Sequence, residues 1–99
     1  MEELYPTNRL AYFRKRMKLS QKQVAQILGL ESAAILSLYE KGTAQPSLER
    51  ALALEIVYRV PIAFLFPGIY ERMREELHAK EDHLAHQRLS KTIQTKNKH

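Results

Sequence analysis

The sequence predicts an all-α protein, a five-helix bundle with a C-terminal helical tail, and three observations favour this fold class. The chain of 99 residues has only three glycines and four prolines, and they stand at the edges of periodic stretches. Apolar residues recur at helical spacing, and alternating or continuous β-branched runs are missing. After residue 68 the composition changes to a mixed-charge segment. We therefore expect a bundle domain over residues 1–68 and an amphipathic helix with a basic end over residues 69–99.

The first two helices are expected at about 7–18 and 20–28. Thr7 is a suitable N-cap for the first helix, and "SQKQ" from Ser20 to Gln23 is a capping box that opens the second. Gly29 suits the left-handed residue that ends a helix, because a residue with a Cβ adopts that conformation only at a cost. The inner positions of the two helices are Leu10, Phe13, Met17, Val24, Ala25 and Leu28.

The third and fourth helices follow the same local signals. Ser32 is expected to cap the third helix, which runs through Glu40 and is closed by Gly42. Pro46 and Ser47 precede the fourth helix, where Glu55 and Arg59 have the i,i+4 spacing of a favourable ion pair. Inner positions of the fourth helix include Leu48, Leu52 and Ile56.

A short fifth helix, "PIAFLF", is expected to have Pro61 in its first turn and to end at Pro67 and Gly68. One tail helix then runs to about residue 88. Tyr70, Leu77 and Leu84 repeat every seven residues with Met73 between them. The other two positions that continue this heptad pattern hold polar residues, Lys80 and Gln87.

The composition excludes several classes of function. Without cysteine the chain has no disulfide, thiolate zinc site or cysteine nucleophile, which favours a reducing, cytoplasmic location. No apolar run is long enough to span a membrane, and no signal peptide is recognisable. We expect neither an enzyme nor a cofactor, because no catalytic set and no glycine-rich phosphate loop are present. His78, Asp82 and His86 share one helix face, but a polar face explains them better than a metal site.

The charge of the chain favours an anionic partner. Its net charge is +5, and residues 9–22 carry six basic side chains and no acidic one. Such a cluster is either a solvated helix face or part of a contact with nucleic acid. Its members are Arg9, Arg14, Lys15, Arg16, Lys18 and Lys22.

Two short helices joined at Gly29 form the pattern of a helix-turn-helix, whose second helix can lie in the major groove of DNA. The stretches "LSQKQVAQILG", "SLYEKG", "QPSLERALAL" and "VPIAFLF" follow one another along the chain. From Leu10 to Phe66 the sequence thereby resembles the λ-repressor and Cro class of DNA-binding domains, the Xre family. The resemblance implies a transcriptional regulator that binds double-stranded DNA as a homodimer, with its third helix in the major groove.

The resemblance also assigns roles to positions. Arg14 and Glu40 match a partly buried ion pair, and Lys41 matches a site that contacts phosphate. The positions expected on or near the DNA are Gln21, Lys22, Ser32, Ala33, Ala34, Ser37, Leu38, Lys41 and Thr43. Contacts between the two copies are expected from Phe64, Phe66, Ile69, Tyr70, Met73 and Leu77.

The chain departs from the family pattern on the third helix. Where many relatives carry amide or guanidinium groups that read base edges, this chain has Ala33, Ala34, Ser37 and Leu38. The apolar side chains of Ala33, Ala34 and Leu38 suit thymine methyls, and Ser37 offers one hydroxyl. The turn "GLES" is one residue longer than usual. Ile35 and Leu38 also fall outside a single inward stripe, so they belong to the DNA face, to a protein interface or to the core.

Two alternatives remain open on the same fold. A protein-binding adaptor, including an antitoxin whose tail from Met73 to Ile93 folds onto a toxin, would use the tail as its contact surface. An architectural DNA-binding protein without sequence preference would suit the basic first helix and the apolar third helix. Truncation after Gly68 separates the regulator from the adaptor: it weakens dimeric DNA binding in the first case and abolishes partner capture in the second.

Overall fold

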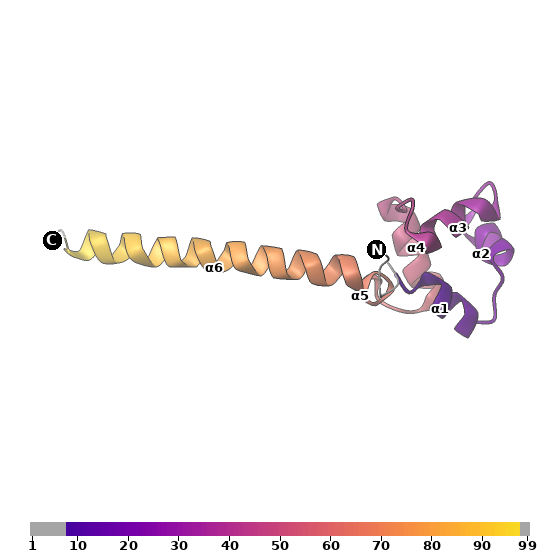
Figure 1. Cartoon of the computed structure of the whole chain (residues 1–99), viewed down its shortest axis with the longest axis horizontal. Helices are drawn as coiled ribbons and strands as arrows, with labels where there is room; N and C mark the ends of the chain where they lie inside the picture. Colours follow the sequence, from indigo (N-terminus) through magenta and orange to yellow (C-terminus); the bar gives the residue numbers. More distant parts are fainter. Residues whose placement is uncertain (1–7, 98–99) are drawn as a thin grey trace, which may run out of the picture. The chain divides into compact units, whose positions relative to one another are not determined.

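The protein is all-α throughout the residues that its computed structural model describes, which are residues 8–97, with side chains for residues 8–89. This part contains no strand, so the predicted fold class is confirmed. Its helices are α1 (Leu10–Arg16), α2 (Gln21–Leu28), α3 (Ala33–Lys41), α4 (Leu48–Tyr58), α5 (Ile62–Leu65) and α6 (Pro67–Asn97), as shown in Figure 1. The chain forms two compact units, and the boundary between them falls between Ile69 and Tyr70.

The helices α1 to α5 share one hydrophobic core in the first unit. Leu10, Leu36, Leu54 and Leu65 come from four different helices, and each has no exposed surface. Full burial of one such side chain contributes about 1.5–3 kcal/mol relative to leaving it in water. The other members of the core are Val24, Ala25, Leu30, Tyr39, Tyr58 and Phe66.

A buried asparagine determines where α1 begins. The Oδ1 atom of Asn8 accepts a hydrogen bond from the backbone N–H of Leu10 at 3.0 Å, and its Nδ2 donates to the Tyr39 carbonyl at 2.9 Å. Asn8 therefore satisfies a free amide at the start of α1 and also ties α1 to α3. The helix is shorter than the predicted span of 7–18, and Thr7, the predicted cap, lies outside the described residues.

The buried face of α4 is not the predicted one. Leu48, Leu52 and Ile56 are 72%, 43% and 74% exposed, and they form an apolar row that we name the α4 stripe. The buried residues of α4 are Ala51, Leu54 and Tyr58. Both sets have helical spacing, i,i+4,i+8 for the α4 stripe and i,i+3,i+7 for the buried set, so periodicity favours neither. The prediction was wrong because this helix has apolar residues on two faces.

The predicted ion pair between Glu55 and Arg59 is not formed. The Oε1 atom of Glu55 instead accepts a hydrogen bond from the backbone N–H of Ile62 at 2.9 Å. Ile62 is the first residue of α5, so the Glu55 carboxylate satisfies a free N–H group at the N-terminus of this helix and complements the helix dipole. Arg59 ends α4 in the left-handed conformation, with φ of 59°, and its side chain is exposed. Pro61 precedes α5 instead of lying in its first turn.

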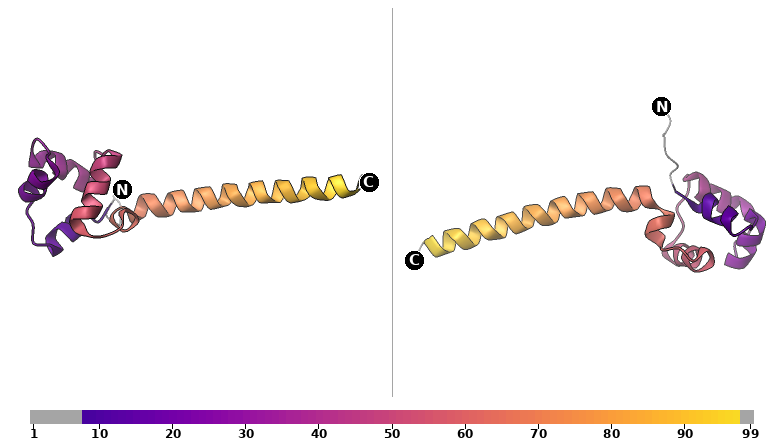
Figure 2. Two further views of the ribbon diagram at one scale, coloured as in Figure 1. Left: turned by 180° about the vertical axis from the view of Figure 1, so that it is seen from behind. Right: turned by 90° about the horizontal axis from the view of Figure 1, so that it is seen from below.

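The tail helix α6 begins earlier and ends later than predicted. Pro67 is its first residue rather than a stop signal, because proline lacks only an N–H that would have no partner in the first turn. The helix continues to Asn97, since neither glycine nor proline follows residue 88. Figure 2 shows α6 as one continuous helix. Every residue from 70 to 89 is exposed.

Shortening a side chain to alanine should affect stability differently on the two faces of α4. We expect Ile56→Ala to change the free energy of unfolding by less than about 0.5 kcal/mol, because its side chain packs on no core. Leu54→Ala, the matched control on the buried face, should lower the free energy of unfolding by about 2–5 kcal/mol. Urea denaturation of the two variants measures both values. Similar losses in the two variants would show that Ile56 belongs to the core.

Candidate nucleic-acid interface

Local capping signals build the helix-turn-helix of α2 and α3. The Ser20 hydroxyl accepts from the Gln23 N–H at 3.0 Å, and Gln23 Oε1 accepts from the Ser20 N–H at 2.8 Å, so the predicted capping box is confirmed. Gly29 ends α2 with φ of 73°, and Gly42 ends α3 with φ of 79°. Ser32 caps α3 as predicted. These signals define both ends of the two helices.

Leu30 accommodates the extra residue in the turn between α2 and α3. Its backbone N–H donates to the Ala25 carbonyl at 2.9 Å, while the Gly29 N–H donates to the Gln26 carbonyl at 3.2 Å. This pair of bonds is a Schellman motif, which commonly places an apolar residue directly after the glycine. Leu30 is only 9% exposed and belongs to the core. The leucine after the turn glycine was the signal in the sequence for this anchor.

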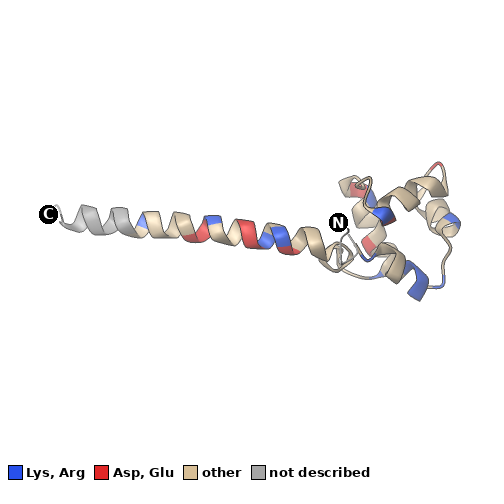
Figure 3. Ribbon diagram, in the orientation of Figure 1, with Lys and Arg blue, Asp and Glu red and all other residues tan. Residues whose placement is uncertain are grey.

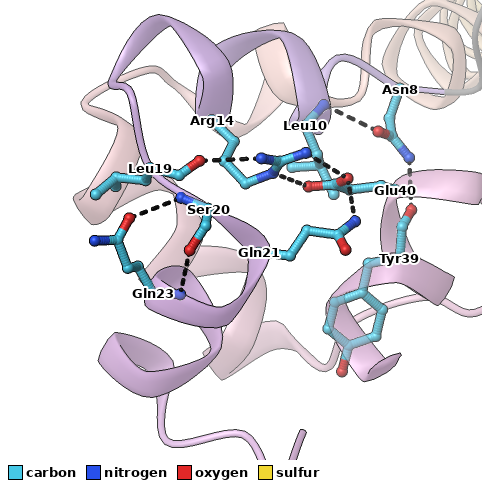
Figure 4. A network of polar contacts seen from close by, with 9 residues as sticks. All are labelled: Asn8, Leu10, Arg14, Leu19, Ser20, Gln21, Gln23, Tyr39 and Glu40. Atoms are coloured by element: carbon cyan, nitrogen blue, oxygen red, sulfur yellow. Dashed lines mark hydrogen bonds and ion pairs between the residues drawn. The ribbon is translucent and has the colours of Figure 1, made fainter. Parts of the chain in front are cut away.

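A polar network connects α1, α2 and α3 (Figure 4). Arg14 Nε donates to Glu40 Oε2 at 2.7 Å, and Arg14 Nη2 donates to Glu40 Oε1 at 3.2 Å. The two side chains are only 11% and 8% exposed. Arg14 Nη1 also donates to the Leu19 carbonyl at 3.0 Å. The hydrogen bond to Glu40 raises the pKa of the Arg14 guanidinium, so this network holds a charged pair.

Gln21 joins the same network, which the sequence did not predict. Its Nε2 atom donates to Glu40 Oε1 at 2.9 Å. Gln21 is the first residue of α2, and Glu40 lies in the last turn of α3, so the bond fixes the start of one helix against the end of the other. One N–H of the Gln21 amide is therefore used inside the protein, whereas its Oε1 accepts no bond from the described residues.

The nine positions expected on DNA differ in exposure. Exposed positions are Lys22, Ser32, Ala34, Leu38, Lys41 and Thr43, and half-buried positions are Gln21, Ala33 and Ser37. Two of the exposed hydroxyl groups have internal partners. Ser32 Oγ accepts from the Ala34 N–H at 3.2 Å, and Thr43 Oγ1 donates to the Leu38 carbonyl at 3.3 Å. These hydroxyls primarily hold the two ends of α3.

The apolar residues of α3 divide between core and solvent. Leu36 is buried, and Ala33 and Ile35 pack against the core from its edge. Ile35 therefore needs no partner outside the bundle. Leu38 is 44% exposed, and Ala34, which lies one turn earlier on the same face, is also exposed. Ala34 and Leu38 form the outward apolar face of α3.

Among residues 8–89, the excess of positive charge lies in the first unit (Figure 3). Residues 8–69 contain nine Lys and Arg against four Glu, whereas residues 70–89 contain four Lys and Arg against five Asp and Glu. Lys22 in α2 and Lys41 in α3 are exposed, and neither forms an ion pair with a described residue. The positive field that attracts a polyanion therefore comes from the bundle and not from this part of the tail.

The basic cluster of α1 is divided between several roles. The guanidinium carbon of Arg9 lies 4.6 Å from the ring centre of Tyr12 and 5.2 Å from that of Phe13. Arg16 lies 6.0 Å from the Tyr12 ring centre, and its hydrogen bond to the Tyr12 hydroxyl lowers the pKa of that tyrosine. Such cation–π contacts hold arginines on the surface of their own helix. Since Arg14 lies in the internal network, the cluster is not one uniform surface for DNA.

The residues expected between two copies differ in exposure. Phe66 is 9% exposed and belongs to the core, and Ile69 packs against that core. Leu65 at the end of α5 and Phe66 directly after it are both buried members of the core. Phe64 is 61% exposed, and Tyr70, Met73 and Leu77 are about half exposed at 48%, 46% and 49%.

Two features are absent from the part of the chain that the structure describes. No group of three His, Cys, Asp or Glu side chains there is arranged to hold a metal ion. No helix in this part combines the length and apolar character that crossing a membrane requires.

The fold and the site define a helix-turn-helix domain in which α3 presents an outward face. Lys22 in α2 and Lys41 at the end of α3 are exposed and form no ion pair with a described residue. A family model described as helix-turn-helix matches residues 10–65, which is more than half of the chain. The protein therefore belongs to this family, the Xre or λ-repressor-like DNA-binding transcription regulators. A comparison with curated proteins finds no match.

Proposed function

We propose that this protein is a sequence-specific transcriptional regulator that binds double-stranded DNA as a homodimer, each copy placing α3 in the major groove. The observation that supports this most is the outward face of α3. Ala34 and Leu38 are exposed there, while the neighbouring Leu36 and Tyr39 hold the helix on the core. The network of Arg14, Gln21 and Glu40 stabilises the orientation of α3 relative to α2.

Methyl contact is the form of base reading that this face allows. The side chains of Ala34 and Leu38 suit the C5-methyl of thymine, which protrudes into the major groove. Neither side chain donates or accepts a hydrogen bond, so it cannot distinguish all four base pairs. We expect the remaining specificity to come from the shape and deformability of the DNA.

Phosphate contacts would come from the ends of the two helices. The amides in the first turn of α2 lack intrahelical acceptors, and the positive end of the helix dipole lies there. Lys22 in this turn and Lys41 at the end of α3 add two exposed ammonium groups. Such contacts position a protein on DNA without reading its sequence.

The role of Lys41 predicts a change in salt dependence. We expect Lys41→Ala to weaken binding roughly fivefold for every DNA sequence near physiological salt, and to reduce the slope of log K against log salt by about 1. Fluorescence anisotropy at several salt concentrations measures both. Arg59→Ala removes one exposed cation from the end of α4 and is the matched control. An equal change in both variants would mean that Lys41 acts only through net charge.

Selection of binding sites from random-sequence duplexes at near-physiological salt tests the proposed function. An enriched palindrome with half-sites about 10 base pairs apart, one turn of DNA, supports a dimeric regulator. Binding without an enriched motif contradicts sequence specificity and favours the architectural alternative. Absence of binding contradicts the DNA-reading role of α3.

A protein-binding adaptor is the second candidate, and the α4 stripe favours it. Three large aliphatic side chains exposed on one helix face are typical of a surface that contacts another protein. The antitoxin version of this alternative uses the tail from Met73 to Ile93, although the side chain of Ile93 lies outside those described. Under the adaptor function, Ile56→Glu would abolish partner capture, whereas a regulator carrying this change would still bind DNA.

A further inference from the structure

The described side chains of the second unit include an exposed apolar row along α6. The helix α6 is 31 residues long, and every one of its residues from 70 to 89 is exposed. Tyr70, Met73, Leu77 and Leu84 are 48%, 46%, 49% and 49% exposed, and they follow the a and d positions of successive heptads. Together with Lys80 and Gln87, which complete these positions, they form what we name the tail seam. Most helices gain their stability from packing of such a face, so α6 lacks that contribution in a single copy.

We propose that the tail seam packs against the tail seam of a second copy in antiparallel orientation, with Tyr70 of each copy opposite Gln87 of the other. This inference rests on the homodimer of the proposed function and adds the orientation and register of its tail. The register is defined by opposite residues whose numbers sum to 157. It places Met73 opposite Leu84 and Leu77 opposite Lys80.

The polar members of the tail seam favour this orientation. In a parallel pair each residue meets its own copy, so Lys80 would lie directly beside a second Lys80 in the seam. Burial of two like charges together is costly. In the antiparallel register Lys80 instead lies opposite Leu77, so its aliphatic stem packs on the leucine while the ammonium group reaches solvent. Gln87 likewise lies opposite Tyr70, whose hydroxyl offers it a hydrogen-bonding partner.

The charges beside the tail seam select the same register. The positions that flank the tail seam are e, which holds Arg74 and Glu81, and g, which holds Glu76 and His83. In antiparallel helices the e positions of the two copies face each other, and so do the g positions. Arg74 then lies beside Glu81 of the second copy, and Glu76 lies beside His83 of the second copy. A parallel pair would place Glu76 beside Glu81, because there the g position of one helix faces the next e position of its partner.

Neighbouring antiparallel registers, displaced by one heptad, lose this complementarity. In the register where opposite seam residues have numbers that sum to 150, Arg74 lies beside Arg74 of the second copy, and Glu76 lies beside its Glu76. In the register where the numbers sum to 164, Glu81 lies beside Glu81 of the second copy, and Arg74 lies beside its Arg88. The sum of 157 is the one of these three registers in which opposite charges meet. In this register Tyr70 of one copy lies opposite Gln87 of the other, 17 residues further along the chain. The two Tyr70 residues are therefore about 25 Å apart along the helix axis.

Disulfide cross-linking of the full chain tests the orientation, because the protein has no cysteine of its own. We expect a mixture of the single variants Met73→Cys and Leu84→Cys to form a mixed disulfide at least tenfold faster than either variant cross-links to itself. Efficient self-linking of Met73→Cys would show a parallel pair and overturn the proposal. Sedimentation of the unmodified chain is measured in parallel.

The sedimentation result separates the failure of this inference from the failure of the homodimer. A dimer in which neither the mixture nor a single variant cross-links overturns the tail pairing, while the homodimer of the proposed function stands. A monomer overturns both. A dimer with the mixed disulfide supports both.

Charge reversal supplies a second test that does not alter the tail seam itself. Arg74→Glu and Glu81→Arg should each weaken dimerisation roughly tenfold, because each reverses two contacts in the dimer. The double variant should return to within a few fold of the unmodified chain. Arg74 also bonds Glu71 in its own helix, but Glu81 is two turns away, so recovery in the double variant reports the contact between copies. Glu75→Arg, on the outer face, is the matched control, and failure of the double variant to recover would overturn the register.

Discussion

Arg14→Ala is expected to lower the free energy of unfolding by about 3–5 kcal/mol, which is the usual cost of removing one partner from a buried ion pair. Glu40 is only 8% exposed on its side chain, so water cannot replace the guanidinium fully. The Gln21 amide would remain as a donor to one carboxylate oxygen. The Leu19 carbonyl would also lose its hydrogen bond from Arg14 Nη1.

Urea denaturation followed by circular dichroism measures this loss, with Arg16→Ala as the control. Arg16 belongs to the same helix but is exposed, and its hydrogen bond and cation–π contact are with the exposed Tyr12, so its removal should change the free energy of unfolding by less than about 1 kcal/mol. The double variant Arg14→Met, Glu40→Met should recover much of the loss, because an apolar pair leaves no buried charge. A loss below about 1 kcal/mol for Arg14→Ala would show that the pair behaves like a surface salt bridge.

Ala34→Glu is expected to weaken DNA binding at least about 100-fold without loss of stability. The new carboxylate would face the groove between two rows of phosphates, where juxtaposed like charges cost several kcal/mol. Ala34 is exposed and is the second residue of α3, so the folded protein has room for the larger side chain. A glutamate in the first turn also interacts favourably with the helix dipole. Loss of binding could not then be attributed to unfolding.

Two controls isolate the position and the charge. Ala34→Gln has the same shape without the charge and should retain binding that depends on phosphate contacts. Ile56→Glu introduces the same charge on the α4 stripe and should reduce affinity less than about fivefold, as expected for a change in net charge alone. Anisotropy titrations and denaturation curves for the three variants provide the measurement. Unchanged affinity in Ala34→Glu would place α3 outside the DNA interface.

The two ends of α2 and α3 and the start of α4 were predictable because their causes are local. The capping box joins Ser20 to a residue three positions away, and Gly29 and Gly42 satisfy a backbone requirement at their own positions. Ser32 and Ser47 cap the next two helices in the same way. Such signals lie within one turn of chain, so a single sequence contains them in full.

The candidate site was only partly predictable. The contact of Arg14 with Glu40 joins residues 26 positions apart, and it was expected through the family resemblance rather than from the spacing of the two charges. The third member, Gln21, bonds Glu40 across 19 positions and was expected on the DNA backbone alone. Its internal bond exists because α2 and α3 pack against each other, and no local pattern reports that packing.

The sequence by itself determined the helical class, the caps, the turn glycines and the family, since each depends on residue types close together in the chain. Only the tertiary structure decided which apolar residues are buried. Leu54 and Phe66 complete the core, whereas Ile56 and Leu38 remain exposed, although all four have comparable apolar character. The physical reason is that a helix with two apolar faces buries the one that its neighbours can cover. That choice depends on how all five helices of the bundle pack together.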